Sequence, residues 1–332
     1  MKSKILVWLV ATFFLTTASL AVAQQPNKVP RIGYLSARND QNREAFRQGL
    51  RGLGYVDGKD IVIEYRWAEG RTEEIPDLVA ELVRLKVDVI VTGVTLAAQA
   101  ARKLTTTVPI VIVGAGDPVG TGLVASLARP GGNITGLSSL APELSGKRVE
   151  LLKESFPKVS RVGVFWNPAS PSNALSWKET EAAARPAALR LQSLEVKSTK
   201  DFESAFAAAV KGRVDALITI RDNVTNTGRP QIVAFAAKHR LPGIYPSVDY
   251  VEDGGLMSYA PDFRVMYRRA AIYVDKILKG TKPEDLPVEQ PMKFEFIINL
   301  KAAKQIGLTI PPNVLVRADK VIKEASAKAG GR

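Results

Sequence analysis

The sequence predicts an α/β protein of two similar halves, each a parallel sheet with helices on both faces. Short β-branched runs alternate with longer segments of helical periodicity, an order that implies parallel strands joined by crossover helices. Three pairs of segments also echo each other at a spacing of about 130 residues. They are "RIGYLS" and "RVGVFW" from Arg31 and Arg161, "VDVIVTG" and "VDALITI" from Val87 and Val214, and "PIVIVGAGD" and "PGIYPSVD" from Pro109 and Pro242. The 332 residues suffice for two domains with cores of their own.

Helical segments precede the buried strands in both halves. "NREAFRQGLRGLGY" reads as a helix that Gly54 ends, because glycine readily turns left-handed after a helix. "EEIPDLVAELVRLK" places Ile75, Leu78, Val79 and Leu82 on one apolar face, and a β-branched run follows directly. "DFESAFAAAVKGRVDALITI" repeats the pattern of helix, glycine and buried strand in the second half.

The first 23 residues have the pattern of an export signal. Lys2 and Lys4 give a positive start, a long apolar run follows, and Ala21-Val22-Ala23 ends it with small residues. The run is also long enough for an uncleaved membrane anchor. The small-residue end and the polar "QQPNK" favour a cleaved signal peptide over residues 1–23, with the cut before Gln24 and a soluble periplasmic product. A lipid anchor would require a cysteine just after the cut, and the sequence contains none.

The composition argues against several kinds of chemistry. Without cysteine there is no thiol nucleophile, disulfide or thiolate metal site, and the single histidine, His239, lies near the end of a predicted helix. We therefore expect no metal, no cofactor and no enzymatic activity. The net charge of +13 is scattered, and Arg264, Arg268 and Arg269 read as a solvated helix face, so we expect no nucleic-acid partner.

Polar residues recur where the predicted strands end. In open parallel sheets, ligands bind beyond the carboxyl ends of the strands. The residues at these positions are Ser36, Asn39, Thr92, Gly93, Thr95 and 114–119 in the first half, and Asn167, Ser170, Ser172, Asp222, Asn223, Ser247 and Asp249 in the second. Any one of them could simply cap a helix or form a turn. Their recurrence at the same strand ends in both halves predicts a cleft for a small polar ligand.

The glycines of "PIVIVGAGDPVGTGLVASL" do not form a nucleotide-binding motif. Gly114, Gly116 and Gly120 have the wrong spacing for a dinucleotide fingerprint, and the stretch lacks the Gly-Lys-Ser/Thr ending of a P-loop. Asp117 would also compete with a phosphate for backbone N–H groups. We expect Asp117 to cap a helix that begins at Pro118, with the loop forming part of the cleft wall.

Several longer motifs carry a family resemblance from about Arg31 to about Pro312. They include "GYVDGKDIVIEYRWAEG", "VPIVIVGAGDPVGTGLVASLARPGGNITGLS", "LLKESFPKVSRVGVFWNP", "DALITIRDN" and "NLKAAKQIGLTIPP". The sequence resembles the ABC-transporter substrate-binding proteins of the tryptophan/tyrosine-type periplasmic group. The resemblance implies a bilobal type I periplasmic-binding fold: two doubly wound parallel-sheet lobes with hinge crossovers. With the internal repeat it places lobe 1 at 30–136 plus about 261–290, and lobe 2 at 137–260 plus about 291–332.

The resemblance also implies a ligand, partners and site residues. A small solute, often an amino acid, would be clamped between the lobes and delivered by a monomeric receptor to an ABC permease in the inner membrane. The expected ligand-binding residues are Ser36, Thr92, Gly93, Asp117, Pro118, Asn167, Ser170, Asp222, Asn223 and Tyr245. By this analogy, hydroxyls and amides hold the ligand carboxylate and Asp222 holds its amino group.

Two departures from the family pattern leave other ligands and roles open. Relatives often carry an acidic residue where this chain reads "NPASPSN", and Phe263 stands where relatives tend to have tyrosine. A neutral or acidic small molecule, aromatic or not, therefore fits as well. Tyr34, Trp166, Tyr245 and Tyr259 could stack on a ring or pack in the core. The alternatives to a transport receptor are a sensory binding protein and, against the composition, a cofactor-binding enzyme.

The export signal gives a first testable prediction. The exported protein should begin at Gln24, because signal peptidase cuts after a small-x-small sequence. N-terminal sequencing of the protein recovered from the periplasm checks this. A product that retains Met1 or the apolar run would establish the membrane-anchored alternative instead.

Overall fold

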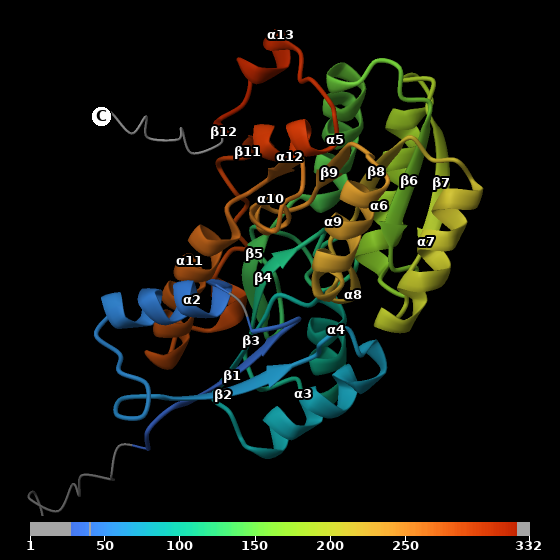
Figure 1. Cartoon of the computed structure of the whole chain (residues 1–332). Helices are drawn as coiled ribbons and strands as arrows, with labels where there is room; N and C mark the ends of the chain where they lie inside the picture. The colour runs from blue at the N-terminus through green and yellow to red at the C-terminus, as the bar shows by residue number, and fades with distance from the viewer. Residues whose placement is uncertain (1–27, 40, 324–332) are drawn as a thin grey trace, which may run out of the picture.

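The computed structural model of the protein describes residues 28–39 and 41–323, which form two sheets in separate halves of the molecule (Figure 1). The expected signal peptide lies outside the described residues. Within those residues, no helix combines the length and apolar character that crossing a bilayer requires.

The first sheet has five strands, all parallel. In spatial order these are β2 (Val62–Trp67), β1 (Arg31–Ser36), β3 (Val89–Thr92), β4 (Ile110–Ala115) and β5 (Ile134–Ser138). Its connecting helices are α2 (Gln41–Gly52), η1 (Thr72–Glu74), α3 (Ile75–Arg84) and α4 (Thr95–Leu104). One face packs with α2, and the other packs with Ile75, Val79 and Leu82 of α3 and with Ala97, Ala98 and Ala101 of α4. The predicted helix faces and the stop at Gly54, with φ +92°, are confirmed.

The second sheet repeats this order and extends it. Its strands are, in spatial order, β12 (Lys320–Ile322), β11 (Glu295–Asn299), β10 (Met257–Ala260), β9 (Gly243–Tyr245), β8 (Ala216–Thr219), β6 (Arg161–Trp166) and β7 (Arg190–Glu195). Its helical segments are α5 (Ala141–Ser155), α6 (Pro171–Ala184), η2 (Thr199–Asp201), α7 (Phe202–Lys211), α8 (Asn223–Thr227), α9 (Arg229–Lys238), α10 (Val248–Glu252), α12 (Leu300–Gln305) and α13 (Pro312–Leu315). Strands β6 to β10 follow the order of β1 to β5, so the predicted doubling of one α/β architecture is confirmed.

The second sheet is not wholly parallel. Strand β11 runs antiparallel to β10, while β12 runs parallel to β11. The chain reaches β11 from the first sheet, and it therefore enters at the carboxyl edge of β10 and has to run in the opposite direction. The parallel-only sheet expected from the sequence is wrong at this edge.

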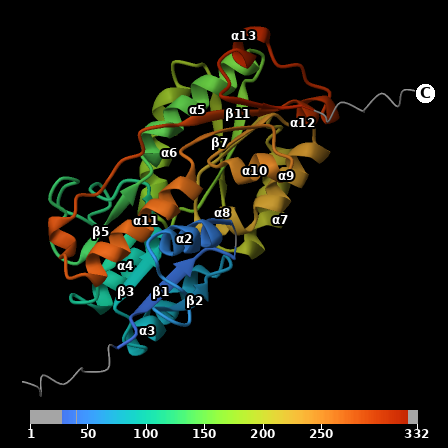
Figure 2. The same ribbon diagram turned by 90° about the vertical axis from the view of Figure 1, so that its left-hand side faces the viewer.

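The chain crosses between the two sheets three times. Strand β5 leads into α5, which packs with α6 of the second half, and β10 leads into α11 (Phe263–Leu278), which packs against α2 and β4 of the first (Figure 2). After η3 (Pro283–Asp285), Glu289 forms an isolated β-bridge with Leu137 of β5. The chain then returns to the second sheet as β11. This packing supports the lobe boundaries expected above, which stay a prediction.

One expected helix does not form. After Pro118 the chain makes successive turns through residues 118–129. Gly120 and Gly122 lower helix propensity by about 1 kcal/mol each, and Gly122 adopts φ +69°, which a right-handed helix cannot contain. The prediction of a helix capped by Asp117 is therefore wrong, although Asp117 does cap the turn.

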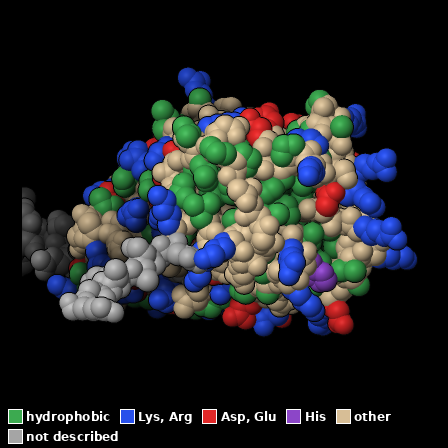
Figure 3. All heavy atoms as spheres, turned by 45° about the horizontal axis from the view of Figure 1, so that its top comes forward, with side chains coloured by type: hydrophobic (Ala, Val, Ile, Leu, Met, Phe, Trp, Pro, Cys, Tyr) green, Lys and Arg blue, Asp and Glu red, His purple; other side chains and the backbone are tan. Residues whose placement is uncertain are grey.

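The surface shows no concentration of charge on the face drawn in Figure 3, where lysine and arginine side chains are scattered among apolar and uncharged ones. The helix face that the sequence predicts to be solvated, which carries Arg264, Arg268 and Arg269, lies on α11. Arg264 on α11 bonds Glu252 at 2.5 Å and Asp249 at 3.5 Å, and Arg269 bonds Glu289 at 2.7 Å. Arg268 and Arg269 are exposed, as the solvated-face interpretation predicts, whereas the partly buried Arg264 is held by its two ion pairs and departs from it.

The packing of α11 on α2 gives a second prediction. A Cβ at Gly49 would lie 2.6 Å from the carbonyl oxygen of Arg268 and 2.8 Å from Cβ of Ala271. Gly49→Leu should therefore separate the two helices and lower the free energy of unfolding by about 1–3 kcal/mol. Urea denaturation measures this. Gly52→Leu, on the same helix with no neighbour within 4 Å, is the control and should not destabilise the protein. Equal effects of the two substitutions would contradict close packing at Gly49.

Candidate ligand-binding cleft

A cavity lies where the carboxyl ends of the two sheets face each other. From the first half it is lined by residues that follow β1, β3 and β4, and from the second half by residues that follow β6 and β8 or begin α5, α6 and α8. The lining residues are Ser36, Ala37, Gly93, Val94, Thr95, Gly114, Gly116, Ser139, Ala141, Ser170, Ser172, Arg221, Asp222, Asn223 and Asn226. The cavity volume is about 30 Å³. The cavity is therefore narrow, and its walls stand close together.

Polar contacts join the two walls directly. The backbone N–H of Gly70 donates to Oδ1 of Asn223 at 3.4 Å, and the Thr72 hydroxyl donates to the Lys197 carbonyl at 3.1 Å. Arg221 Nη1 donates to the Gly93 carbonyl at 3.5 Å. These contacts hold the cleft closed in this structure.

Glycine permits the close approach of the walls. A Cβ added at Gly116, just after β4, would overlap the hydroxyl oxygen of Ser172 in the first turn of α6. The φ of Gly116 is not positive, so this glycine serves proximity between the halves and not a special turn. Gly114, with φ +77°, is the residue whose backbone needs glycine's freedom.

The structure brings half of the expected ligand-binding residues to the cavity. Ser36, Gly93, Ser170, Asp222 and Asn223 line it. Thr92, Asp117, Pro118, Asn167 and Tyr245 do not. Thr92 is buried below the wall, where its hydroxyl oxygen accepts a hydrogen bond from Val94 N at 3.1 Å.

Asp117 stabilises the turn after β4. Its Oδ1 accepts from the N–H of Val119 at 3.1 Å and of Gly120 at 2.8 Å. The carboxylate occupies the N–H groups that a phosphate would need, as the sequence suggests. Pro118 is buried behind it.

The aromatic residues proposed as a stacking surface belong to the cores. Tyr245 is fully buried and stacks on Tyr250 with ring centroids 4.9 Å apart. Trp166 stacks on Trp177 at 5.0 Å, and Tyr34 packs on Phe46 at 5.4 Å. The placement of Tyr245 in the cleft is wrong, because its strand directs the side chain into the cluster under α9 and α10.

Asp222 combines a structural position with a place in the cavity. It is the N-cap of α8, where its Oδ1 accepts from Val224 N at 2.9 Å. The same oxygen accepts from Nδ2 of Asn167 at 3.0 Å, so Asn167 supports the site from behind. Burial raises the pKa of Asp222, although the hydrogen bonds from Asn167 and the backbone, and the charge of Arg221, oppose the rise.

Asn223 presents a hydrogen-bond donor without a partner. The residue is 3% exposed, and its Oδ1 is fixed by the N–H of Gly70. Its Nδ2 is buried and makes no hydrogen bond in the structure. Because buried donors are nearly always paired, this amide nitrogen is suited to a ligand acceptor.

Arg221 is a cavity residue that the sequence reasoning missed. Its guanidinium lies over the ring of Phe263, 4.1 Å from the centroid, and lines the cavity beside Asp222. The signal was present, since Arg221 is the first residue of "RDN" directly after a buried strand. Asn226, one turn further along α8, was also missed.

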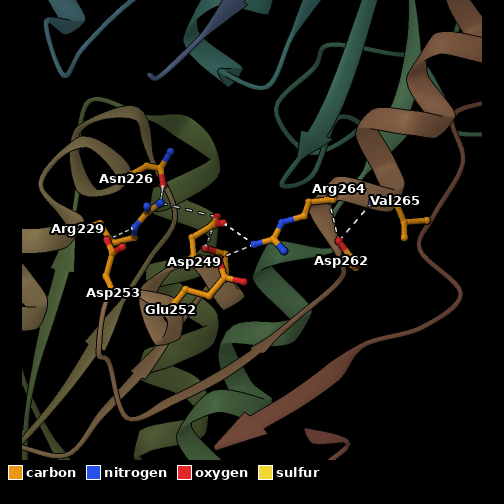
Figure 4. Close-up of polar contacts among 9 residues, drawn as sticks. Asn226, Arg229, Asp249, Glu252, Asp253, Asp262, Arg264 and Val265 are labelled. Atoms are coloured by element: carbon orange, nitrogen blue, oxygen red, sulfur yellow. Dashed lines mark hydrogen bonds and ion pairs between the residues drawn. The ribbon is translucent and has the colours of Figure 1, made fainter. Parts of the chain in front are cut away.

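Asn226 connects the cavity to an ion-pair network behind it (Figure 4). Its Oδ1 accepts from Arg229 Nη1 at 3.2 Å, and Arg229 pairs with Asp253 at 2.7 Å and Asp249 at 3.7 Å. Asp249 also contacts Arg264, which projects from α11 (Figure 4). Because α11 packs on the first sheet and α10 belongs to the second half, the network spans both halves.

Two α/β halves enclosing a polar cavity at their facing strand ends define a solute-binding protein of the periplasmic-binding type. The chain belongs to the family of ABC transporter substrate binding proteins, whose pattern it matches over residues 36–322. It is 27% identical over 289 residues to a tyrosine-binding protein of Clostridioides difficile, which covers 86% of this chain and 83% of that one. The expected family and bilobal α/β fold are therefore confirmed, and these homologues are binding proteins, not enzymes.

Two solved structures show which arrangement of the halves this structure resembles. An ABC domain from Streptococcus pneumonia in complex with L-Trp is 30% identical, with a TM-score of 0.81 over 88% of this chain and 99% of that one. The ligand-free, open structure of a substrate binding protein from Clostridium difficile is 25% identical, with a TM-score of 0.59 over 89% and 99%. The better match to the ligand-bound protein agrees with the contacts across the cleft.

Asp222 gives a third prediction. Asparagine caps helices as well as aspartate does, so Asp222→Asn should keep the cap and remove the cost of burying a charge. At pH 7 the variant should be at least as stable as the wild type. Because burial raises the folded-state pKa, the wild type should gain stability relative to the variant as the pH falls towards 3.8. Urea denaturation between about pH 4 and 7 measures the difference.

Asp222→Ala is the companion variant. It removes the cap and leaves Nδ2 of Asn167 without its acceptor, so it should lower the free energy of unfolding by about 0.5–2 kcal/mol. A constant difference between wild type and Asp222→Asn across this pH range would show that Asp222 has an ordinary pKa.

Proposed function

We propose that the protein is the exported receptor of an ABC importer, which clamps a small solute between its lobes and delivers it to a membrane permease. The observation that carries the proposal is the narrow polar cavity between the facing strand ends, closed by contacts from both walls. A cavity of this kind occurs at a common position for ligands in α/β proteins.

The proposal includes the ligand class and the place of action. Relatives with a tyrosine-binding name or with bound L-Trp support an amino acid or a small carboxylate as the solute. The receptor acts as a periplasmic monomer after cleavage before Gln24, and its partner is an ABC permease in the inner membrane. Ser36, Gly93, Ser170, Asp222 and Asn223 are the proposed contacts that sequence and geometry share.

Closure of the cleft gives a fourth prediction. Gly116→Val should hold the halves apart, because even a Cβ at this position overlaps Ser172. The ligand would then lose contacts from one wall, and affinity should fall at least about tenfold, equivalent to about 1.4 kcal/mol. Calorimetry measures affinity, and small-angle scattering measures the contraction that ligand produces in the wild type and not in the variant.

The screen for this experiment uses the mature protein with the common amino acids and small carboxylates. A ligand at a hundred times its Kd should stabilise the protein by about 2.7 kcal/mol, which a thermal-shift assay detects. Gly52→Val, remote from the cleft and with open space around it, is the control for the glycine replacement. Unchanged affinity in Gly116→Val, or no stabilising compound, would contradict a solute clamped between the walls.

A further inference from the structure

Among the residues that the structure describes, the cavity lining offers many hydrogen-bond donors and a single carboxylate. Its donors include the guanidinium of Arg221, the amide of Asn223 and four hydroxyls, which belong to Ser36, Thr95, Ser170 and Ser172. Asp222 is the acid among the lining residues, and its Oδ1 already accepts two hydrogen bonds. Such a wall matches a ligand rich in acceptor oxygens.

Arg221 brings a cation whose hydrogen-bonding capacity is largely unused. A guanidinium has five N–H donors, and the described residues use one of them, in the 3.5 Å bond to the Gly93 carbonyl. No Asp or Glu of the described residues forms an ion pair with Arg221. Its plane is held over Phe263, so the side chain is oriented before a ligand arrives. A fork of this kind binds carboxylates through two parallel hydrogen bonds.

Asn223 adds a second donor that lacks a partner. Its Nδ2 is buried and makes no hydrogen bond. Because the N–H of Gly70 donates to Oδ1, the amide is oriented with Nδ2 facing away from Gly70. Leaving a buried donor unsatisfied costs free energy, which an acceptor on the ligand would restore.

The remaining wall limits the body of the ligand. Ala37, Val94 and Ala141 supply short apolar surface, and the space between the walls is narrow. Over the described parts of the chain, no tyrosine, tryptophan or phenylalanine lines the cavity, and the ring face of Phe263 is covered by Arg221. A short aliphatic body fits this wall, whereas a ligand ring would find no ring to stack on.

We infer that the solute is a small aliphatic carboxylate without an amino group, and that Arg221 and Asn223 bind its carboxylate. The inference rests on the proposed solute-binding function and narrows its ligand class. An ammonium group on the ligand would meet the positive charge of Arg221, and of the two carboxylate oxygens of Asp222 one, Oδ1, is already engaged by Val224 and Asn167. A hydroxyl in place of the ammonium can both donate and accept among the serines.

The test compares 2-hydroxy acids with amino acids of the same carbon skeleton. The mature protein is titrated by calorimetry with L-lactate and L-alanine, and with L-malate and L-aspartate. L-tyrosine, L-tryptophan, sulfate and phosphate complete the panel. We expect a hydroxy acid to bind at least about tenfold tighter than its amino-acid counterpart. Arg221→Gln should weaken that binding roughly ten- to a hundredfold, since it removes a charged hydrogen-bonding fork.

Two further variants separate charge, geometry and folding. Arg221→Lys keeps the charge without the fork and should recover part of the affinity. Arg185→Gln makes the same replacement at an exposed position outside the cavity and should change nothing. Melting temperatures of the unliganded variants verify that each is folded.

Each adverse outcome identifies which idea fails. Tighter binding of tyrosine, tryptophan or the amino acids, or unchanged affinity in Arg221→Gln, overturns the inference while solute binding stands. Preference for sulfate or phosphate overturns the carboxylate assignment. If none of these compounds binds, the inference fails, and the wider screen with Gly116→Val decides separately whether the cleft binds a solute.

Discussion

The structure depends on how closely the carboxyl edges of two parallel sheets can approach. Each sheet has its own apolar clusters on both faces, so the cores give little support to closure. The walls meet instead through glycines and small polar residues, as at Gly116 and Ser172. The polar contacts that join them are long, at 3.1 to 3.5 Å, and therefore weak. A ligand that supplies acceptors to both walls would therefore add to closure.

Two kinds of arginine lie near the cleft. Arg229 and Arg264 share Asp249 and are further held by Asp253 and Glu252, so their charges are balanced within the protein. Arg221 lies in the cavity and lacks such a partner among the described residues. Arg229 and Arg264 join α9, α10 and α11 to one another, whereas Arg221 is available for ligand recognition. This contrast explains why charge counting along the sequence could not distinguish them.

The sequence predicted the doubled α/β topology because strand and helix periodicity survive in both halves at a near-constant spacing. It also anticipated that Asp222 could cap a helix and line the cavity. A residue between the carboxyl end of a strand and the next helix can do both. Tyr245 was misplaced because an aromatic residue at the end of a strand can face the core or the cleft, and only packing decides. The turn after Pro118 was read as a helix because Asp117 and Pro118 match the signals of a helix start, and the glycines that follow were given too little weight. Arg221 was missed, although it stands beside Asp222 in "RDN", because the basic residues were read as scattered surface charge.

The three crossings between the sheets lie side by side, since Leu137, Pro261 and Gln290 line one common groove. Three connecting segments that lie side by side resist twisting and sliding of one half against the other far more than they resist bending. The motion that remains easy is a hinge rotation, described by one angle between the halves. Every distance between a point on one half and a point on the other is then a function of that single angle. The distance between two surface points on different halves therefore changes when a ligand closes the cleft. A partner that binds both points at once can distinguish the liganded from the unliganded protein without contacting the ligand.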